Sequence, residues 1–116
     1  MTDVEVIIPV YNGAALVGRA LASVLAQSTD ATMRVHVIDD ASTDGSLAVV
    51  NALAAGDVRV RVSSNPANAG VSVSRTRGVR ESDAPFIAFL DQDDVWLADQ
   101  LAPWRWARSA SALTMP

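Results

Sequence analysis

The chain alternates short runs of β-branched and apolar residues with segments whose apolar residues recur at helical spacing, and this alternation restricts the fold more than any other feature. The runs indicate strands at residues 4–10, 34–39, 58–63 and 85–90. The other segments predict helices at residues 16–25, 47–56, 70–82 and 95–108. Strands that alternate with helices form a parallel sheet with right-handed crossovers. We therefore expect one α/β domain, a Rossmann-like parallel sheet of about four strands with helices on both faces.

Composition excludes several classes of protein. The net charge of -4 argues against nucleic-acid binding, since no basic face is available to displace phosphate counterions. The chain has no cysteine, which excludes disulfides, thiol nucleophiles and cysteine-based zinc sites. All nine cationic side chains are arginine, and the absence of lysine excludes P-loop phosphate cradles and Schiff-base chemistry.

The hydropathy and the N-terminus of the chain bear on its location in the cell. No apolar run approaches the roughly 18 residues that span a bilayer, and the N-terminus lacks the basic region of a signal peptide. We expect a cytoplasmic location, with peripheral association at the inner face of a membrane as an open alternative.

Three groups of residues stand at the carboxyl ends of predicted strands. They are Pro9-Val10-Tyr11, Asp39-Asp40 and Asp91-Gln92-Asp93-Asp94. Each group alone is also typical of a turn or a helix N-cap. In parallel sheets, however, ligands bind beyond the carboxyl ends of the strands, where these three groups would meet. Their shared place favours a binding site.

The acidic residues after the last strand suit a divalent cation. Asp91 and Asp93 extend to the same side of an extended segment, and hard oxygen ligands select Mg²⁺ or Mn²⁺. Without a cation, these acids would repel a diphosphate by about 4 kcal/mol per charge pair at 4 Å and an effective dielectric of 20. A cation reverses that repulsion and stabilises a leaving diphosphate. Asp39 or Asp40 could accept a hydrogen bond from a base or ribose.

Other polar and aromatic residues have simpler interpretations. His36 lies in the middle of a strand, so we expect a packed or hydrogen-bonded core histidine. Arg59 and Arg61 are expected on a solvated face. Arg75 and Arg77 are two apart on a helix, so at most one of them points toward the site. Three tryptophans near the end are expected in the core or an interface, and would promote self-association if exposed: Trp96, Trp104 and Trp106.

Four segments together resemble a known family. They are Val6 to Gly13, Val37 to Gly45, Asn68 to Gly78, and Phe89 to Asp94. In this order they are similar to the successive motifs of family 2 glycosyltransferases with the GT-A fold, and the match covers residues 4 to about 101. The resemblance implies a strand order of 3-2-1-4, with residues 1–108 as the nucleotide-sugar-binding portion and residues 109–116 as a tail.

The resemblance also implies a function and roles for individual residues. The family transfers a sugar with inversion from a nucleoside diphosphate donor, usually UDP-linked, to a glycan, lipid or polysaccharide acceptor. Asp40 would contact the nucleobase beside the backbone of Pro9, Val10 and Tyr11, and Arg75 would lie near the nucleotide. Asp91 would serve the ribose or a metal-bound water, and Asp93 would ligate Mn²⁺ or Mg²⁺.

The chain departs from the family pattern in two places. Thr76 stands where many relatives have asparagine. The family's catalytic base follows the metal motif at some distance, and the later acids of this chain, Asp94 and Asp99, do not resemble it. We therefore expect a chain that binds donor but lacks its base and transfers no sugar by itself.

Other functions remain to be compared with this one. A non-catalytic assembly module with a GT-A-like fold, using the Trp96 to Trp106 end, is the alternative. Phosphoacceptor receiver domains and Asp-x-Asp phosphatases both require a lysine. A nicotinamide dinucleotide fold requires a Gly-x-Gly-x-x-Gly motif after the first strand. The sequence has none of these features.

Overall fold

The protein forms a parallel sheet whose central strands follow the predicted order. The computed structural model describes residues 2–29, 31–99, 101 and 114–115. The strands are β1 (Val4–Val10), β2 (Met33–Asp39), β3 (Val60–Ser64), β4 (Phe86–Phe89) and β5 (Thr114–Met115), and the helices are α1 (Val17–Leu25), α2 (Ser46–Ala55) and α3 (Val71–Arg80). The strand order is β3-β2-β1-β4-β5, with every pair parallel. This confirms the predicted α/β class and the order 3-2-1-4, to which β5 adds a short edge strand.

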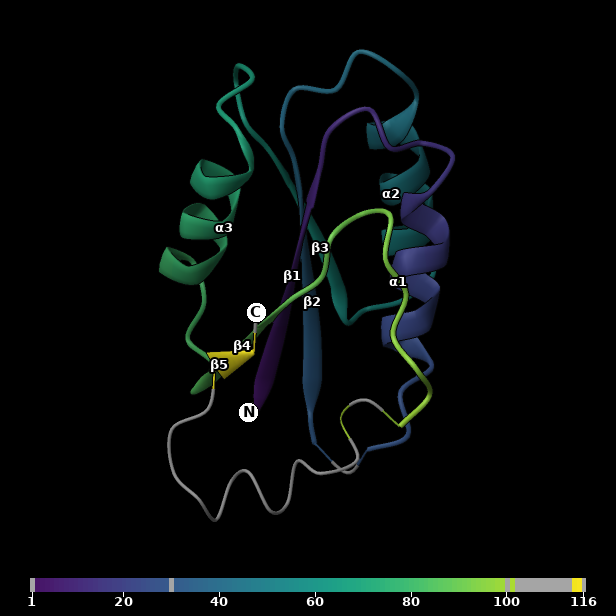
Figure 1. The fold of residues 1–116 in the computed structure, drawn as a ribbon, viewed down its shortest axis with the longest axis vertical. Coiled ribbons are helices and arrows are strands. Elements are labelled where there is room, and N and C mark those ends of the chain that lie inside the picture. The colour runs from purple at the N-terminus through teal and green to yellow at the C-terminus, as the bar shows by residue number, and fades with distance from the viewer. Residues whose placement is uncertain (1, 30, 100, 102–113, 116) are drawn as a thin grey trace.

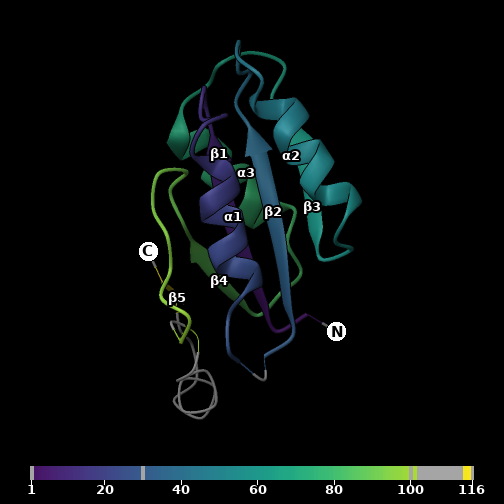
Figure 2. The same ribbon diagram turned by 90° about the vertical axis from the view of Figure 1, so that its right-hand side faces the viewer.

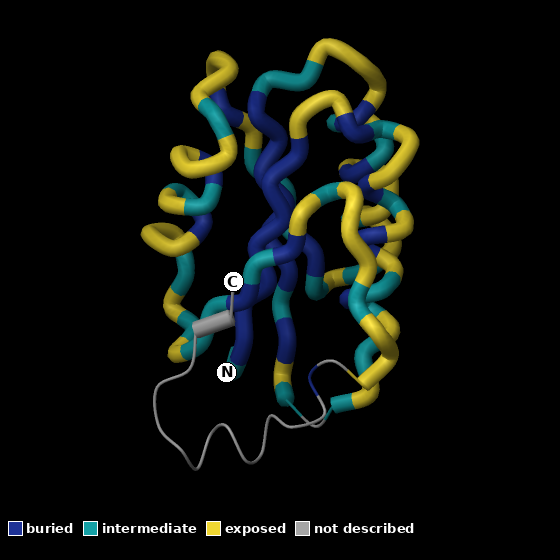
Figure 3. The backbone as a smooth tube through the Cα atoms, in the orientation of Figure 1, coloured by how far each residue is buried: buried dark blue, intermediate teal, exposed yellow. Residues whose placement is uncertain are grey.

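Helices cover both faces of the sheet, which explains why its central strands β1 and β2 are almost completely buried. Helix α3 lies on one face, and α1 and α2 lie on the other (Figures 1 and 2). All seven residues of β1 are buried. The alternate residues Val4, Val6, Ile8 and Val10 share a core with α1, and Figure 3 shows the buried strands between more exposed helices and loops. A strand covered on both faces has no need of polar alternation.

Helix α3 packs unusually close to β1 at Gly78. A Cβ atom added there would lie 2.7 Å from Cδ1 of Ile7 and 2.8 Å from its Cγ2. Both residues are buried, so there is no free space for a side chain at position 78. Glycine therefore sets the distance between α3 and the sheet.

The same face of the sheet holds a buried carboxylate, and one prediction is corrected there. Glu5 is fully buried and receives two bonds from Arg34, at 2.9 and 3.1 Å, and one from Arg61 at 3.2 Å. Burial alone would raise the pKa of Glu5, but hydrogen bonds from Arg34 and Ser82 and the charges of both arginines outweigh it, and the pKa lies below its usual value. Arg61 is therefore part of an internal ion network, because β2 and β3 bring it beside β1.

The expected strand β3 and the expected core histidine of β2 are both present, with a small change in where β3 begins. The strand predicted at residues 58–63 lies at the sheet edge and begins at Val60, because the Asp57 carboxylate accepts the Arg59 amide at 2.9 Å and forms a turn. His36 is a hydrogen-bonded core histidine, as expected, with Nε2 2.7 Å from the Ser63 hydroxyl. Burial, followed by the charge of Arg61, lowers the pKa of His36 to about 4.

The prediction of a helix at residues 95–108 is wrong for its described part. Residues 95–99 run as an irregular segment alongside α1 (Figure 2). Side chains of α1 and the residues after it satisfy the backbone of this segment: the Trp96 amide donates to Ser23 Oγ at 3.0 Å, and Gln27 bonds both the Leu97 carbonyl and the Leu101 amide. These long-range bonds replace the local ones that a helix would make.

Trp96 packs partly buried against the hydrophobic core. Trp104 and Trp106, with the rest of the predicted helix, lie outside the described residues. None of the described helices combines the length and apolarity needed to cross a membrane.

Candidate functional site

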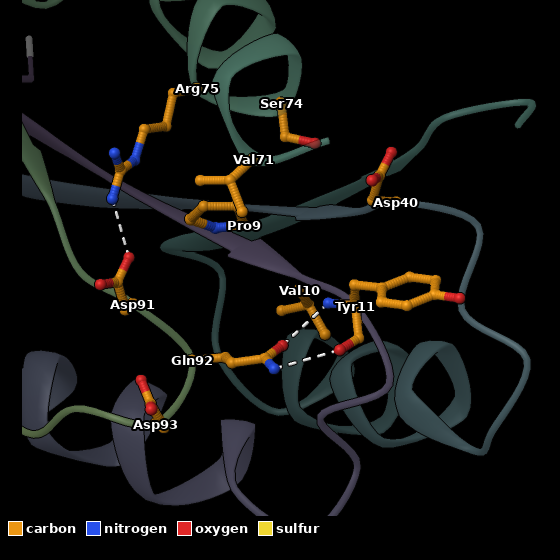
Figure 4. A pocket seen from close by; sticks show the side chains of 10 residues that line it. All are labelled: Pro9, Val10, Tyr11, Asp40, Val71, Ser74, Arg75, Asp91, Gln92 and Asp93. Atoms are coloured by element: carbon orange, nitrogen blue, oxygen red, sulfur yellow. Dashed lines mark hydrogen bonds and ion pairs between the residues drawn. The ribbon is translucent and has the colours of Figure 1, made fainter. Parts of the chain in front are cut away.

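A pocket of about 310 Å³ opens at the carboxyl ends of the central strands, beside the start of α3 (Figure 4). Its walls come from the end of β1, the residue after β2, α3 and the acidic segment after β4. The lining residues are Pro9, Val10, Tyr11, Asp40, Val71, Ser74, Arg75, Asp91, Gln92 and Asp93. The three groups that follow predicted strands therefore do meet in one place.

Every predicted site residue lines this pocket except Asp39. Asp39 is the last residue of β2 and is buried beneath the following loop, where its Oδ2 accepts the Ser42 amide at 3.1 Å. Asp40 comes next in an extended chain, so its side chain points the other way and reaches the pocket.

Three lining residues had no predicted role of their own: Val71, Ser74 and Gln92. Ser74 and Gln92 stand next to residues that were named, Arg75 and the two acids. Their polarity within those motifs was the available signal.

Asp40 is a buried carboxylate that is surrounded by donors. Its Oδ1 accepts from Asn65 Nδ2 at 2.7 Å and the Ala69 amide at 2.9 Å, and its Oδ2 accepts from Asn68 Nδ2 at 3.1 Å and the Gly70 amide at 2.8 Å. Burial would raise the pKa of Asp40, but the bonds from Asn65, Ala69 and Gly70 prevail and lower it. The carboxylate therefore stays ionised and ties the loop before α3 to the end of β2.

The loop after β1 is held by the loop before α2 and by Ser46, the first residue of that helix. Three successive amides donate to side chains there: Asn12 to Ser42 Oγ at 3.0 Å, Gly13 to Ser46 Oγ at 2.9 Å and Ala14 to Asp44 Oδ2 at 3.2 Å. In return, Oδ1 of Asn12, whose φ is 49°, accepts the Thr43 amide at 2.8 Å. The polar residues at 42–46 thus shape the pocket wall without lining it.

Arg75 is the cation of the pocket. Its Nη2 lies 2.8 Å from Oδ1 of Asp91, and its guanidinium lies over the Phe89 ring, 5.5 Å from the centroid. Arg77 points elsewhere and bonds Glu81 and the Ser64 carbonyl. This confirms that only one of the two arginines faces the site.

Three acids after β4 form a group that fits a divalent cation. Asp91, Asp93 and Asp94 can each offer one carboxylate oxygen, and these oxygens lie within 4.8 Å of one another. All three are exposed, and Arg75 offsets part of the charge at Asp91. An all-oxygen donor set of this kind suits Mg²⁺ or Mn²⁺, which keep several waters beside one or two carboxylates.

Comparison with known proteins gives a consistent result for most of the chain. The family model described as Glycosyl transferase family 2 matches residues 5–104, a range that contains every residue of the pocket. An uncharacterized glycosyltransferase of Haemophilus influenzae is 34% identical over 101 residues, which are 87% of this chain and 40% of that protein. The chain spans less than half the length of the curated relatives it matches.

Solved structures share the fold. TarS from S. aureus in complex with UDP has a TM-score of 0.83 at 26% identity, covering 94% of this chain and 32% of that one. Mannosyltransferase PcManGT from Pyrobaculum calidifontis, in complex with GDP-Man and Mn²⁺, has a TM-score of 0.80 at 27% identity, covering 90% of this chain and 32% of that one.

Proposed function

The chain belongs to glycosyl transferase family 2, and from this premise we propose that its pocket binds the nucleoside diphosphate of a sugar donor. The observation that carries the proposal is one pocket in which Tyr11, Arg75, Asp91 and Asp93 converge from three separate segments. Its volume of about 310 Å³ lies within the usual range for small-ligand sites, roughly 300–1,000 Å³. The family that the four motifs resemble is confirmed by the match of the family model to residues 5–104.

The nucleobase end of the pocket is proposed to be formed by Pro9, Val10, Tyr11 and Val71, whose apolar and aromatic surfaces suit a flat base. Asp40 borders this end. Because the oxygens of Asp40 already accept four hydrogen bonds, an N–H of a base would have to replace one of the donors. The side-chain amide of Asn68 is the donor we propose, since its bond is the longest of the four, at 3.1 Å. Asp39 lies outside the pocket, so we propose that it supports this end through Ser42.

The diphosphate end is proposed to lie at the acidic group. A Mn²⁺ or Mg²⁺ ion held by Asp93, with Asp91 or Asp94, would offset the negative charge that develops on a leaving diphosphate. Arg75 already faces Asp91 at 2.8 Å and is placed to orient a phosphate or ribose oxygen beside it. Asp91 would then contact the ribose or a metal-bound water.

For the whole protein we propose sugar transfer with inversion to a glycan, lipid or polysaccharide acceptor, at the inner face of a membrane or in the cytoplasm. One similar structure binds UDP and another binds GDP-Man, so the first experiment compares UDP, GDP and TDP. UDP is our first choice.

The test is a thermal unfolding measurement on the 116-residue chain with nucleotide, with and without Mn²⁺. At a UDP concentration tenfold above Kd, binding should stabilise the fold by about 1.4 kcal/mol, which raises Tm by about 5 °C. EDTA or Asp93→Ala should remove the rise. Asp99→Ala, which changes an exposed acid outside the pocket, is the matched control and should keep it. If no nucleoside diphosphate shifts Tm at millimolar concentration with Mn²⁺ present, the proposal fails.

A further inference from the structure

The side chain of Gln92 makes two hydrogen bonds to the backbone of Tyr11, although the residues are 81 positions apart. Its Oε1 accepts the Tyr11 amide at 2.8 Å, and its Nε2 donates to the Tyr11 carbonyl at 3.1 Å (Figure 4). One amide group thus bonds both polar backbone groups of one residue, in the way that a neighbouring strand would.

This contact stands where the sheet itself stops pairing. Strands β1 and β4 are in register only as far as Ile7 and Phe89, and the Leu90 amide adds a last bond to the Ile7 carbonyl at 3.1 Å. β1 continues to Val10 without β4 beside it. Gln92 therefore takes over the role of the missing strand at Tyr11, on the side of the acidic group.

The loop that Gln92 reaches is fixed from both sides. Its next three amides, from Asn12 to Ala14, are bonded by side chains of residues 42–46, as described above. The Tyr11 amide is bonded by Gln92 from the opposite side. Four successive amides thus depend on side chains from two distant segments, and one of these segments carries the candidate metal ligands.

Gly13 leaves the space in which the Gln92 amide lies. A Cβ atom at position 13 would be 2.7 Å from Cδ of Gln92 and closer still to its Oε1. Because Cβ contacts that short do not occur, any side chain at position 13 would push the amide away from Tyr11.

We propose that Gln92 is a positioning residue that couples the acidic group to the nucleobase end of the pocket. The inference rests on the proposed function, and it deepens it: the residue between Asp91 and Asp93 serves the base through Tyr11, while its neighbours serve the cation and diphosphate. Loss of Gln92 should therefore weaken binding of uridine, which has no phosphate, by the same factor as binding of UDP with Mn²⁺. Loss of Asp93 should weaken only UDP.

The test uses the 116-residue chain and the variants Gln92→Ala, Gly13→Ala and the double variant. Amide hydrogen exchange in the ligand-free protein should be faster at Tyr11 in both single variants. Affinities for uridine and for UDP with Mn²⁺ should each fall about tenfold, because without its two hydrogen bonds to Gln92 the loop would hold the binding conformation only about a tenth of the time. The double variant should be no worse than Gln92→Ala, since Gly13→Ala acts by displacing that side chain. Asn51→Ala, which removes an exposed amide from α2, is the control and should match the wild type.

The outcomes distinguish the positioning role of Gln92 from the proposed nucleotide binding. Tyr11 exchange at the wild-type rate in Gln92→Ala would overturn the positioning role, whatever the protein binds. A loss of UDP affinity without a loss of uridine affinity would also overturn it, since Gln92 would then act through the acidic group alone. A wild-type chain that binds no nucleotide contradicts the proposed function, and the exchange rates then still decide whether Gln92 holds the loop.

Discussion

Replacing Asp40 by asparagine tests whether this carboxylate holds the pocket together or is a free acceptor. In the variant, the two oxygens that now accept four donors become one oxygen and one NH₂ group. Whichever way the amide turns, its NH₂ group faces the backbone amide of Ala69 or of Gly70, and neither can turn away. Two hydrogen bonds to a charged acceptor are lost, which we estimate at about 3 kcal/mol after partial relaxation.

The assay for Asp40→Asn is thermal or urea unfolding without ligand at pH 7. A loss of about 3 kcal/mol corresponds to a fall in Tm of about 10 °C for a domain of this size. The pKa of Asp40 is lower in the folded protein than in the unfolded chain, so its stabilisation is present above the unfolded value, about 3.9, and is lost as pH falls through the folded value. The difference in the free energy of unfolding between the wild type and Asp40→Asn should therefore become smaller below about pH 4.

Asp99→Asn is the matched control for this experiment, because Asp99 is exposed and should tolerate the change. A variant Asp40→Asn that unfolds within about 2 °C of the wild type at pH 7 would refute the reasoning. Asp40 would then be a solvated acceptor whose bonds contribute nothing net to the fold.

Two further predictions concern the α3 face of the sheet, away from the pocket. Glu5→Gln leaves Arg34 and Arg61 without their shared buried anion, and because both arginines keep some contact with water we expect a loss of about 2–3 kcal/mol. Urea unfolding of Glu5→Gln, of Arg34→Ala and of the double variant measures it, and additive losses would contradict the pairing. Gly78→Ala places a Cβ 2.7 to 2.9 Å from three atoms of Ile7 and should lower the free energy of unfolding by about 1–3 kcal/mol. Ile7→Ala should lower it less in the Gly78→Ala variant than in the wild type. An unchanged Tm for Gly78→Ala would show that α3 can move away freely.

Much of the fold follows from local patterns. The β-branched runs and helical stripes identified four strands and three helices, and alternation alone implied a parallel sheet. Because parallel strands place their carboxyl ends at one edge, Tyr11, Asp40 and the acids after β4 were expected to share a site, and all of them except Asp94 line one pocket. The helix expected at residues 95–108 failed in its described part because its bonding partners, Ser23 and Gln27, lie some 70 residues away.

What the sequence by itself determined is the set of elements, their order and the edge of the sheet that carries the chemistry, since these depend on period and polarity along the chain. Only the tertiary structure decided which of two adjacent acids faces the pocket, that Arg61 meets Glu5, and that Gln92 bonds Tyr11 instead of pointing into solvent. Those outcomes depend on distances between segments 30 to 80 residues apart. They are set by strand register and by how closely the layers pack, which no local pattern records.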